Sequence, residues 1–236
     1  MSSASSRPAP APATARKAPT AFERPAVLAV FTALLLLVGG WVVSTAWTEL
    51  RAEFPYLAAQ DRAKRWTEGT SPAPTEAAWQ KVLAELHSSE KVRPDSPALQ
   101  ELLGSMYLFG AQQGWQSDDQ NLARADRSLV HYRQALKLRP TDGMTWALLA
   151  MALADTSSPA PALAEAINQA LTLAPNDNHT QLVLLHLAVR HWERVPPELQ
   201  AWATQLFEDG NVAQRKHINA LAGHYGWEFT SETPPR

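Results

Sequence analysis

The sequence predicts an all-α protein in which one N-terminal transmembrane helix precedes a domain of degenerate helical repeats. Residues 26–48 contain no charged side chain over twenty-three positions. After residue 70, apolar residues recur at spacings of three and four, which is typical of amphipathic helices. The phrases YRQALKLRPTD and INQALTLAPND end at Asp142 and Asp177, thirty-five residues apart. Such a period indicates stacked helical hairpins, because a single hairpin cannot bury its apolar face alone.

Composition limits the classes of function. The chain has 236 residues, of which 45% are hydrophobic, and this is enough for one or two domains with a core. It contains no cysteine, which excludes disulfides, thiolate metal sites and cysteine nucleophiles. The formal net charge of −2 argues against broad nucleic-acid binding, which needs a basic surface.

Residues 1–25 are expected to form a disordered cytoplasmic tail. They are rich in Ser, Ala and Pro and hold almost no large apolar residue before Phe22. Such a segment cannot bury enough surface to order itself. Both a plain solvated tail and a docking tail for a cytoplasmic partner fit this composition.

Residues 26–48 are assigned to the transmembrane helix. In helical form the segment is about 35 Å long, slightly more than the hydrocarbon core of a bilayer. A buried core helix would normally show a polar face. A cleaved signal peptide is the other alternative, because Ser44-Thr45-Ala46 resembles a cleavage site, although the apolar run is longer than signal peptides have.

The distribution of charge predicts the orientation of the span. Four basic residues and one acid precede it, whereas residues 49–60 carry one basic residue and two acids. By the positive-inside rule, the N-terminus is cytoplasmic and the C-terminal domain lies on the opposite side of the membrane.

Residues 49–70 are interpreted as a juxtamembrane stalk. Phe54, Tyr56 and Trp66 are candidate interfacial anchors, and Pro55 is expected to break any continuous helix.

The helical-repeat domain is assigned to residues 71–228, and residues 229–236 are expected to be a flexible C-terminal tail. In SPALQELLGSMYLFG, Ser96 suits an N-cap and Pro97 the first helical position. The final segment, NVAQRKHINALAGHYG, is expected to form a capping helix.

The repeat units resemble the tetratricopeptide family. Residues 110–121 contain about a dozen extra residues between the two helices of the first unit, and this insertion departs from the family pattern. The third unit has lost the small-residue code, as terminal units do. The first unit matches the family spacing at Leu103, Gly104, Tyr107, Ser128, Tyr132, Ala135 and Pro140, and the second at Trp146, Leu149, Ala150, Leu153, Leu163, Ile167, Ala170 and Pro175.

From residue 99 to residue 200 the chain also resembles the VpsP-like family, small membrane-anchored proteins of bacterial extracellular polysaccharide clusters. The segments LRPTDGMTWALLAMALA and TQLVLLHLAVRHWERVPPELQ carry this resemblance, together with the single amino-terminal span. It implies a role in polysaccharide biosynthesis or export. Together with the span and its predicted orientation, this gives a bacterial inner-membrane protein with a periplasmic domain. The resemblance brings no catalytic residue and no cofactor.

Tetratricopeptide-like proteins commonly bind partners along a concave groove formed by their first helices. Adaptable methionines in such a groove favour an apolar segment of another protein. Alternatively, Met144 and Met151 are core residues. The predicted groove positions are Glu101, Ser105, Met144, Ala147, Met151, His179, Leu182 and His186.

Arg124, Arg127 and His131 recur at spacings of three and four, on a helix face predicted to lie away from the apolar stripe. They form a possible ridge for an anionic polysaccharide or for lipid headgroups. Such a run of charge is also typical of the solvated face of an amphipathic helix.

Motifs for catalysis and metal binding are missing from the sequence. It has no phosphate-binding Gly-Lys-Ser/Thr and no Gly-x-Ser-x-Gly. His186 and His191 are five residues apart, whereas zinc peptidase helices use four. Asp118 and Asp119 are interpreted as solvated loop residues, with a divalent cation site as the alternative. We therefore expect no metal, no cofactor and no enzyme activity.

These observations predict a membrane-anchored periplasmic scaffold or adaptor for extracellular polysaccharide biosynthesis or export. Its expected partners are proteins, among them polysaccharide polymerases, transferases or export components, and no nucleic acid. An adaptor of another envelope pathway, such as cytochrome maturation or cell division, fits the same pattern. A glycan-acting enzyme would need paired carboxylates about 5 to 10 Å apart in a cleft.

Overall fold

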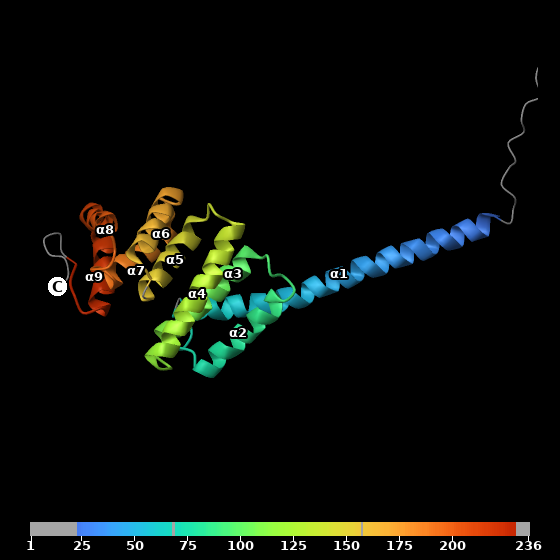
Figure 1. Ribbon diagram of the computed structural model, residues 1–236, viewed down its shortest axis with the longest axis horizontal. Coiled ribbons are helices and arrows are strands. Elements are labelled where there is room, and N and C mark those ends of the chain that lie inside the picture. The colour runs from blue at the N-terminus through green and yellow to red at the C-terminus, as the bar shows by residue number, and fades with distance from the viewer. Residues whose placement is uncertain (1–22, 68, 157, 230–236) are drawn as a thin grey trace, which may run out of the picture. The chain divides into compact units, whose positions relative to one another are not determined.

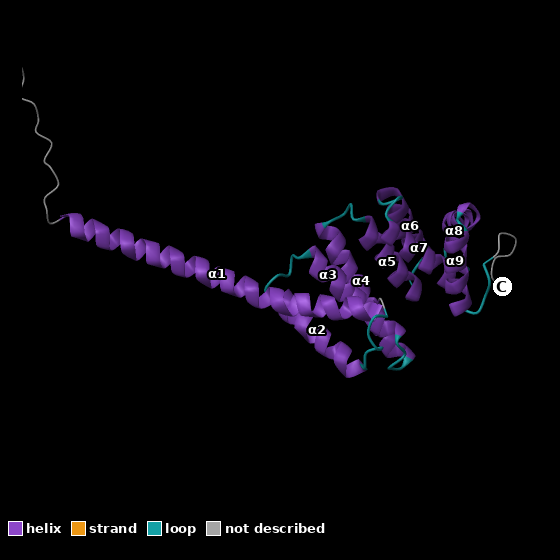
Figure 2. Ribbon diagram, turned by 180° about the vertical axis from the view of Figure 1, so that it is seen from behind, coloured by secondary structure: helices purple, strands orange, loops and turns teal. Residues whose placement is uncertain are grey.

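The structure is a computed structural model that describes residues 23–67, 69–156 and 158–229 (Figure 1). These residues form nine α-helices and no strand, which confirms the all-α prediction (Figure 2). The chain divides into two compact units, residues 1–48 and residues 49–236. Residues 1–22 and 230–236, which hold most of the expected tails, lie outside the described residues. The helices are α1 (Glu23–Thr67), α2 (Glu76–Glu90), α3 (Pro97–Gln112), α4 (Asp118–Leu138), α5 (Gly143–Asp155), α6 (Ala160–Leu173), α7 (Asn178–Arg190), α8 (Pro197–Asp209) and α9 (Val212–His224).

The first unit contains the apolar part of α1, which is long and apolar enough to cross a membrane. Its large side chains from Val27 to Trp47 are exposed. The hydroxyls of Thr32 and Thr45 each donate to a backbone carbonyl of the preceding turn at 2.9 Å. These hydroxyl groups therefore need no water to satisfy their hydrogen bonds, as an apolar environment requires.

Contrary to the expected break, Pro55 lies inside α1. Proline removes one helical hydrogen bond, so the continuation of the helix needs support from packing. Ala59 and Ala63 supply it, because they are 0% and 3% exposed within a core cluster that α2 and α3 share. Trp66 also stacks on Phe109 of α3, with 6.3 Å between the ring centroids. Residues that were expected to form a stalk thus contribute to the core of the second unit.

Capping and one buried tryptophan define the pair α2 and α3. The side chains of Thr75 and Ser96 accept backbone N–H groups at the starts of the two helices, and Pro97 occupies the first position of α3. Trp79 is 4% exposed, and its indole N–H donates to the carbonyl of Met106 at 2.7 Å. This bond satisfies the buried indole and fixes α2 against α3.

The segment expected to be an insertion is partly helical. α3 continues to Gln112, and α4 begins at Asp118. Between them, the ring of Trp115 lies 5.7 Å from the ring of Trp79, measured between centroids. The inserted residues therefore extend the core around α2 and α3.

The two similar phrases occupy equivalent places in the fold. α4 ends at Leu138 and α6 ends at Leu173, each two residues before a proline. Asp142 and Asp177 then cap α5 and α7, each accepting a backbone N–H from the residue three positions later, at 3.2 and 2.8 Å. Each such cap contributes about 1 kcal/mol. Each phrase thus ends one helix and begins the next.

Successive helices pack on one another, and α5 contacts α3, α4, α6 and α7. Small residues permit this close approach. A Cβ at Gly143 would lie 2.5 Å from the Cβ of Ala174, and one at Gly104 would lie 2.8 Å from the ring of Tyr132. The larger core cluster extends from Leu108 of α3 to Phe229. Its largest fully buried side chains are Tyr132, Leu153, Ile167, Leu184, Leu187, Leu199, Ile218 and Phe229.

The residues after α9 return to the core. Gly226 has a φ of +83°, in the left-handed region that glycine adopts without strain. Beyond this turn, Phe229 is 2% exposed, and its ring centroid lies 5.4 Å from that of Trp192 and 5.3 Å from that of Trp227. The backbone N–H of Phe229 donates to Oδ1 of Asn219 at 3.1 Å, which fixes the end of the described chain against α9.

Candidate functional site

The predicted groove residues of α3 are engaged within the domain. Glu101 accepts a hydrogen bond from the Thr145 hydroxyl at 2.7 Å and pairs with Arg139 at 3.3 Å. Burial raises the pKa of Glu101 above its usual value, despite these two partners. Ser105 and the hydroxyl of Tyr132 share a hydrogen bond of 3.1 Å. Both residues therefore connect α3 to its neighbours.

Ser105 also lines a cavity of about 630 Å³ between α3 and the last part of α1. The end of α1 thus lies where the predicted groove would begin. The other lining residues are Leu57, Gln60, Asp61, Ala63, Lys64, Leu102 and Met106.

The predicted groove residues of α5 lie in the interior. Ala147 is fully buried and Met151 is 7% exposed, both within the main core cluster. Met144 is half-buried, with its sulfur 3.9 Å from the hydroxyl of Thr180. α5 is apolar on all sides, and such a helix is buried by neighbours on every face. Ala147 and Met151 therefore do not face an open groove, and Met151 is a core residue.

The predicted groove residues of α7 are more accessible. His179 and Leu182 are exposed, whereas His186 is half-buried. Burial lowers the pKa of His186, and the charges of His217 and Arg190 act in the same direction. The neutral form of His186 is therefore favoured.

Leu182 lies in an apolar groove between α7, α8 and α9, which we call the C-terminal groove. Its volume is about 360 Å³, and no Asp, Glu, Lys or Arg lines it. The lining residues are Asn178, Gln181, Leu182, Leu185, Leu206, Asn211, Ala213, Gln214, His217 and Ile218.

Several amides at the edge of the C-terminal groove are already bonded within the protein. Asn211 and Gln214 form a capping box at the start of α9, with hydrogen bonds of 3.0 and 2.8 Å. Gln181 donates to the carbonyl of Pro175 at 2.7 Å. These bonds are local to the starts of α7 and α9, and they leave fewer polar groups free at the edge of the groove. The surface that remains suits an apolar, uncharged segment.

The basic ridge of α4 is packed against α2. Arg124 is 12% exposed, lies 4.5 Å above the ring of Trp79 and pairs with Glu76. The guanidinium of Arg127 lies 5.7 Å from the ring centroid of Tyr107, and the residue itself is exposed. The predicted solvated face is therefore internal at Arg124, which lies against α2, whereas Arg127 remains exposed beside α3. The ridge was expected to bind an external anion. Arg124 instead pairs with Glu76, a carboxylate of the same chain.

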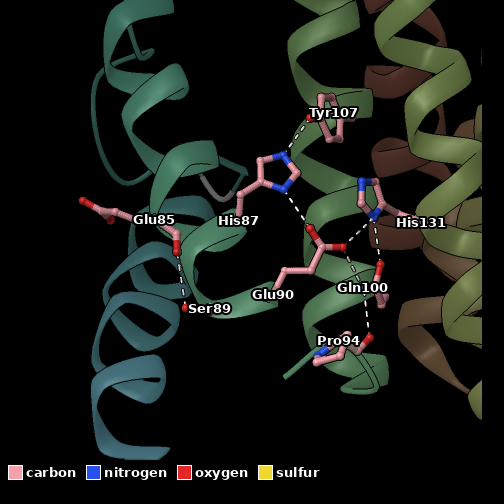
Figure 3. Close-up of polar contacts among 8 residues, drawn as sticks. All are labelled: Glu85, His87, Ser89, Glu90, Pro94, Gln100, Tyr107 and His131. Atoms are coloured by element: carbon pink, nitrogen blue, oxygen red, sulfur yellow. Dashed lines mark hydrogen bonds and ion pairs between the residues drawn. The ribbon is translucent and has the colours of Figure 1, made fainter. Parts of the chain in front are cut away.

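His131, the third residue of the ridge, belongs to a polar network between α2, α3 and α4 (Figure 3). Its Nδ1 lies 2.8 Å from Oε1 of Gln100 and 3.8 Å from Oε1 of Glu90. Burial lowers the pKa of His131, although the carboxylate of Glu90 opposes this effect. The pKa of Glu90 is itself low: burial opposes ionisation, but hydrogen bonds from His87 and Gln100 outweigh it.

The same network contains a carboxylate, an imidazole and a hydroxyl in series. Nδ1 of His87 lies 2.8 Å from Glu90, and Nε2 lies 2.8 Å from the hydroxyl of Tyr107 (Figure 3). This order of groups resembles a proton relay. Tyr107, however, is only 6% exposed, so its hydroxyl is not presented to a substrate. The network therefore holds three helices together.

A second polar cluster joins the ends of α3, α5 and α7. The side chain of Asp155 is 7% exposed and accepts from Nε2 of His191 at 2.8 Å and from Gln112 at 2.8 Å. It also pairs with Arg190 at 3.1 Å. Although burial opposes ionisation, the hydrogen bond from His191 and the charge of Arg190 lower the pKa of Asp155. Sequence reasoning missed this cluster, because its members lie up to 79 residues apart and share no motif.

Asp155 and Asp118 both line a hollow of about 230 Å³, together with Arg190. Paired carboxylates are one requirement of a glycan-cleaving enzyme. The general acid of such an enzyme needs a raised pKa, whereas the pKa of Asp155 is lowered and its oxygens are bonded to other side chains. Asp155 therefore does not suit the role of the general acid.

The candidate metal ligands are dispersed. No group of three or more His, Asp or Glu among residues 23–67, 69–156 and 158–229 is arranged to hold a metal ion. Asp118 and Asp119 are exposed in the first turn of α4, where acids stabilise a helix N-terminus. His191 is bonded to Asp155, so it is not presented together with His186.

Of the eight predicted groove residues, only Leu182 lines the C-terminal groove. Sequence reasoning missed Leu206 and Ile218, whose positions in apolar stripes of α8 and α9 were the available signal. No protein-family model, curated protein or solved structure matches the chain. The site is therefore interpreted from the geometry of this chain.

Proposed function

We propose that the protein is a membrane-anchored adaptor that binds another protein through the C-terminal groove. The groove is the observation that carries this proposal. Its surface is mainly apolar and no Asp, Glu, Lys or Arg lines it, whereas the carboxylates and histidines of the two polar clusters are bonded to other side chains within the domain. α1 supplies the candidate membrane anchor.

The partner segment that suits the groove is an amphipathic helix with an uncharged apolar face. Helices of this kind bind grooves through a few large apolar side chains. Leu182 is 44% exposed, and Val212, at the start of α9 beside the groove, is 76% exposed. Burial of such side chains on both partners stabilises a complex by about 25 cal/mol for each Å² of apolar surface.

Two further features support a tetratricopeptide-like adaptor. The phrases YRQALKLRPTD and INQALTLAPND occupy equivalent helix ends. In addition, α5 contacts α3 and α7, the first helices of the preceding and following helix pairs. The resemblance of residues 99–200 to the VpsP-like family supports a role in extracellular polysaccharide biosynthesis or export. The charge bias around the span supports a domain on the periplasmic side of a bacterial inner membrane.

Site-specific photocrosslinking in the native membrane tests this proposal. A crosslinking amino acid replaces Leu182 in the C-terminal groove, and a control protein carries it in place of Val130, which is 63% exposed on α4. The expected result is a polysaccharide polymerase, transferase or export component captured from position 182 and not from position 130.

Two results would contradict the proposal in different ways. Capture of haem-maturation or cell-division proteins from position 182 would move the adaptor to another envelope pathway. Equal capture from both positions would show that the C-terminal groove does not select a partner.

A further inference from the structure

We propose that a second hollow, formed by the turn between α7 and α8 and by the residues after α9, binds a neutral sugar unit of a glycan chain. This inference goes beyond the adaptor function and does not depend on it. We call the site the aromatic hollow. It has a volume of about 360 Å³ and is lined by Val189, Arg190, His191, Trp192, Glu193, Arg194, Tyr225 and Trp227.

The aromatic side chains of the hollow are held in place before any ligand arrives. Trp192 and Trp227 lie 5.9 Å apart between ring centroids, and both pack against the buried ring of Phe229. Gln200 donates to the backbone carbonyl of Trp192 at 2.7 Å. A ligand therefore does not have to order these rings, which reduces the entropic cost of binding.

The turn that carries the polar side chains of the hollow is fixed as well. Arg194 donates to the backbone carbonyls of Ala154 and Thr156, the latter at 3.1 Å. His191 is bonded to Asp155 at 2.8 Å. Both contacts connect the turn to the end of α5, so the polar groups of the hollow have defined positions.

Three aromatic residues of the hollow present both apolar rings and open polar groups. Trp192, Tyr225 and Trp227 are half-buried, so part of each ring meets solvent. Among the described residues, the indole N–H groups of Trp192 and Trp227 and the hydroxyl of Tyr225 have no hydrogen-bond partner. None of these three groups is buried. A sugar ring matches this surface, because its C–H groups stack on aromatic faces while its hydroxyls bond to the polar atoms at their edges.

The charges of the hollow favour a neutral ligand. The charge of Arg190 is paired with Asp155 at 3.1 Å. Arg194 and Glu193 then bring one charge of each sign to the hollow. Sugar hydroxyls both donate and accept, so they can use a cationic donor and an anionic acceptor together. An acidic sugar or a lipid phosphate would instead need an excess of positive charge.

A proline-rich peptide is the competing ligand, because aromatic grooves also bind polyproline helices. Such a peptide offers carbonyl acceptors, but proline has no N–H to donate. The carboxylate of Glu193, which is exposed and has no ion-pair partner among the described residues, would then accept hydrogen bonds from water alone, whereas a sugar hydroxyl can donate to it. The hollow therefore fits a sugar better than a polyproline segment.

Binding is tested with the full-length protein in a polyoxyethylene detergent, whose headgroup carries no sugar. Isothermal titration calorimetry measures the affinity of the protein for four ligands. Cellohexaose and maltohexaose are neutral sugars, hexagalacturonate is an acidic sugar, and octaproline is the peptide. W227L removes one aromatic face of the hollow. W202L is its matched control, because Trp202 is also half-buried against the same core but does not line the hollow.

We expect saturable binding of at least one neutral hexasaccharide. W227L should weaken this binding about tenfold through the lost stacking contact, and W202L should leave it unchanged. E193Q changes only an exposed side chain and should weaken binding severalfold without affecting folding, whereas E198Q on α8 should not. This second pair remains informative if W227L fails to fold.

Four outcomes would overturn the proposal. The first is that neither neutral sugar binds, and the second is that neither W227L nor E193Q weakens the binding. The third is that hexagalacturonate binds more tightly than either neutral sugar, and the fourth is that only octaproline binds. The last result would assign the aromatic hollow to a peptide. None of them bears on crosslinking from Leu182, so the two proposals fail independently.

Discussion

Replacing Gly110 with alanine tests how tightly α2 and α3 are packed. A Cβ at this position would lie 2.4 Å from Cζ2 and 2.5 Å from Cε2 of Trp79. The Trp79 ring cannot easily move away, because it is 4% exposed, donates to the carbonyl of Met106 and lies beneath the guanidinium of Arg124. The added methyl group therefore collides with a fixed ring.

Opposing contributions decide the size of the effect. Alanine is the better helix former by about 1 kcal/mol. Overpacking a filled core costs about 1 to 3 kcal/mol, and displacing the indole from its carbonyl partner costs about 1 kcal/mol more. G110A should therefore lower the free energy of unfolding by about 1 to 3 kcal/mol.

Thermal and denaturant unfolding of the full-length protein in a nonionic detergent, followed by far-ultraviolet circular dichroism, measures this change. G223A is the matched control, because Gly223 lies in α9 and a Cβ there would meet no atom within 4 Å. It should raise the stability by up to about 1 kcal/mol. If G110A were as stable as G223A, the packing of Trp79 against Gly110 would not be as described.

Three further predictions follow from the polar clusters and the groove. His131 is half-buried with a pKa below its ordinary value of 6.5, so as the pH drops from 7 toward 5 the unfolded chain binds a proton more readily than the folded chain, and stability should fall. H131Q should reduce this dependence, as measured by unfolding at both pH values. D155N should lower the free energy of unfolding by about 1 to 3 kcal/mol, because it removes the carboxylate that His191 and Arg190 share. D118N is the control at an exposed site, and it should lower the free energy of unfolding by less than about 0.5 kcal/mol in the same assay. L182D should abolish co-purification of the crosslinked partner at unchanged melting temperature, whereas V130D should retain the partner.

Features that depend on neighbouring residues were predictable from the sequence. The apolar run of α1 needs only length and composition, and the caps Ser96, Asp142 and Asp177 need only the residues of one turn. The phrases YRQALKLRPTD and INQALTLAPND indicated a repeated helical hairpin, because the same turn chemistry recurs in both.

Features that depend on distant partners were not predictable. The spacing of Arg124 and His131 indicated one helix face, but only packing reveals that α2 covers it. In the same way, Met151 is buried because α5 has neighbours on all sides. Helix α1 continues past Pro55 because Ala59, in the next turn, is packed in the core. Periodicity identifies a face of a helix and does not say which element lies against it.

Labelling of single cysteines in intact spheroplasts tests most directly whether the helical domain is anchored on the periplasmic side. The chain has no cysteine of its own, so each introduced thiol reports one position. V130C lies at a residue that is 63% exposed on α4, and S6C precedes the span. A membrane-impermeant maleimide should label V130C in intact spheroplasts and S6C only after detergent is added, with both proteins remaining in the membrane after a carbonate wash. Labelling of S6C alone in intact spheroplasts, or release of the labelled domain as a soluble fragment, would contradict the membrane-anchored periplasmic adaptor.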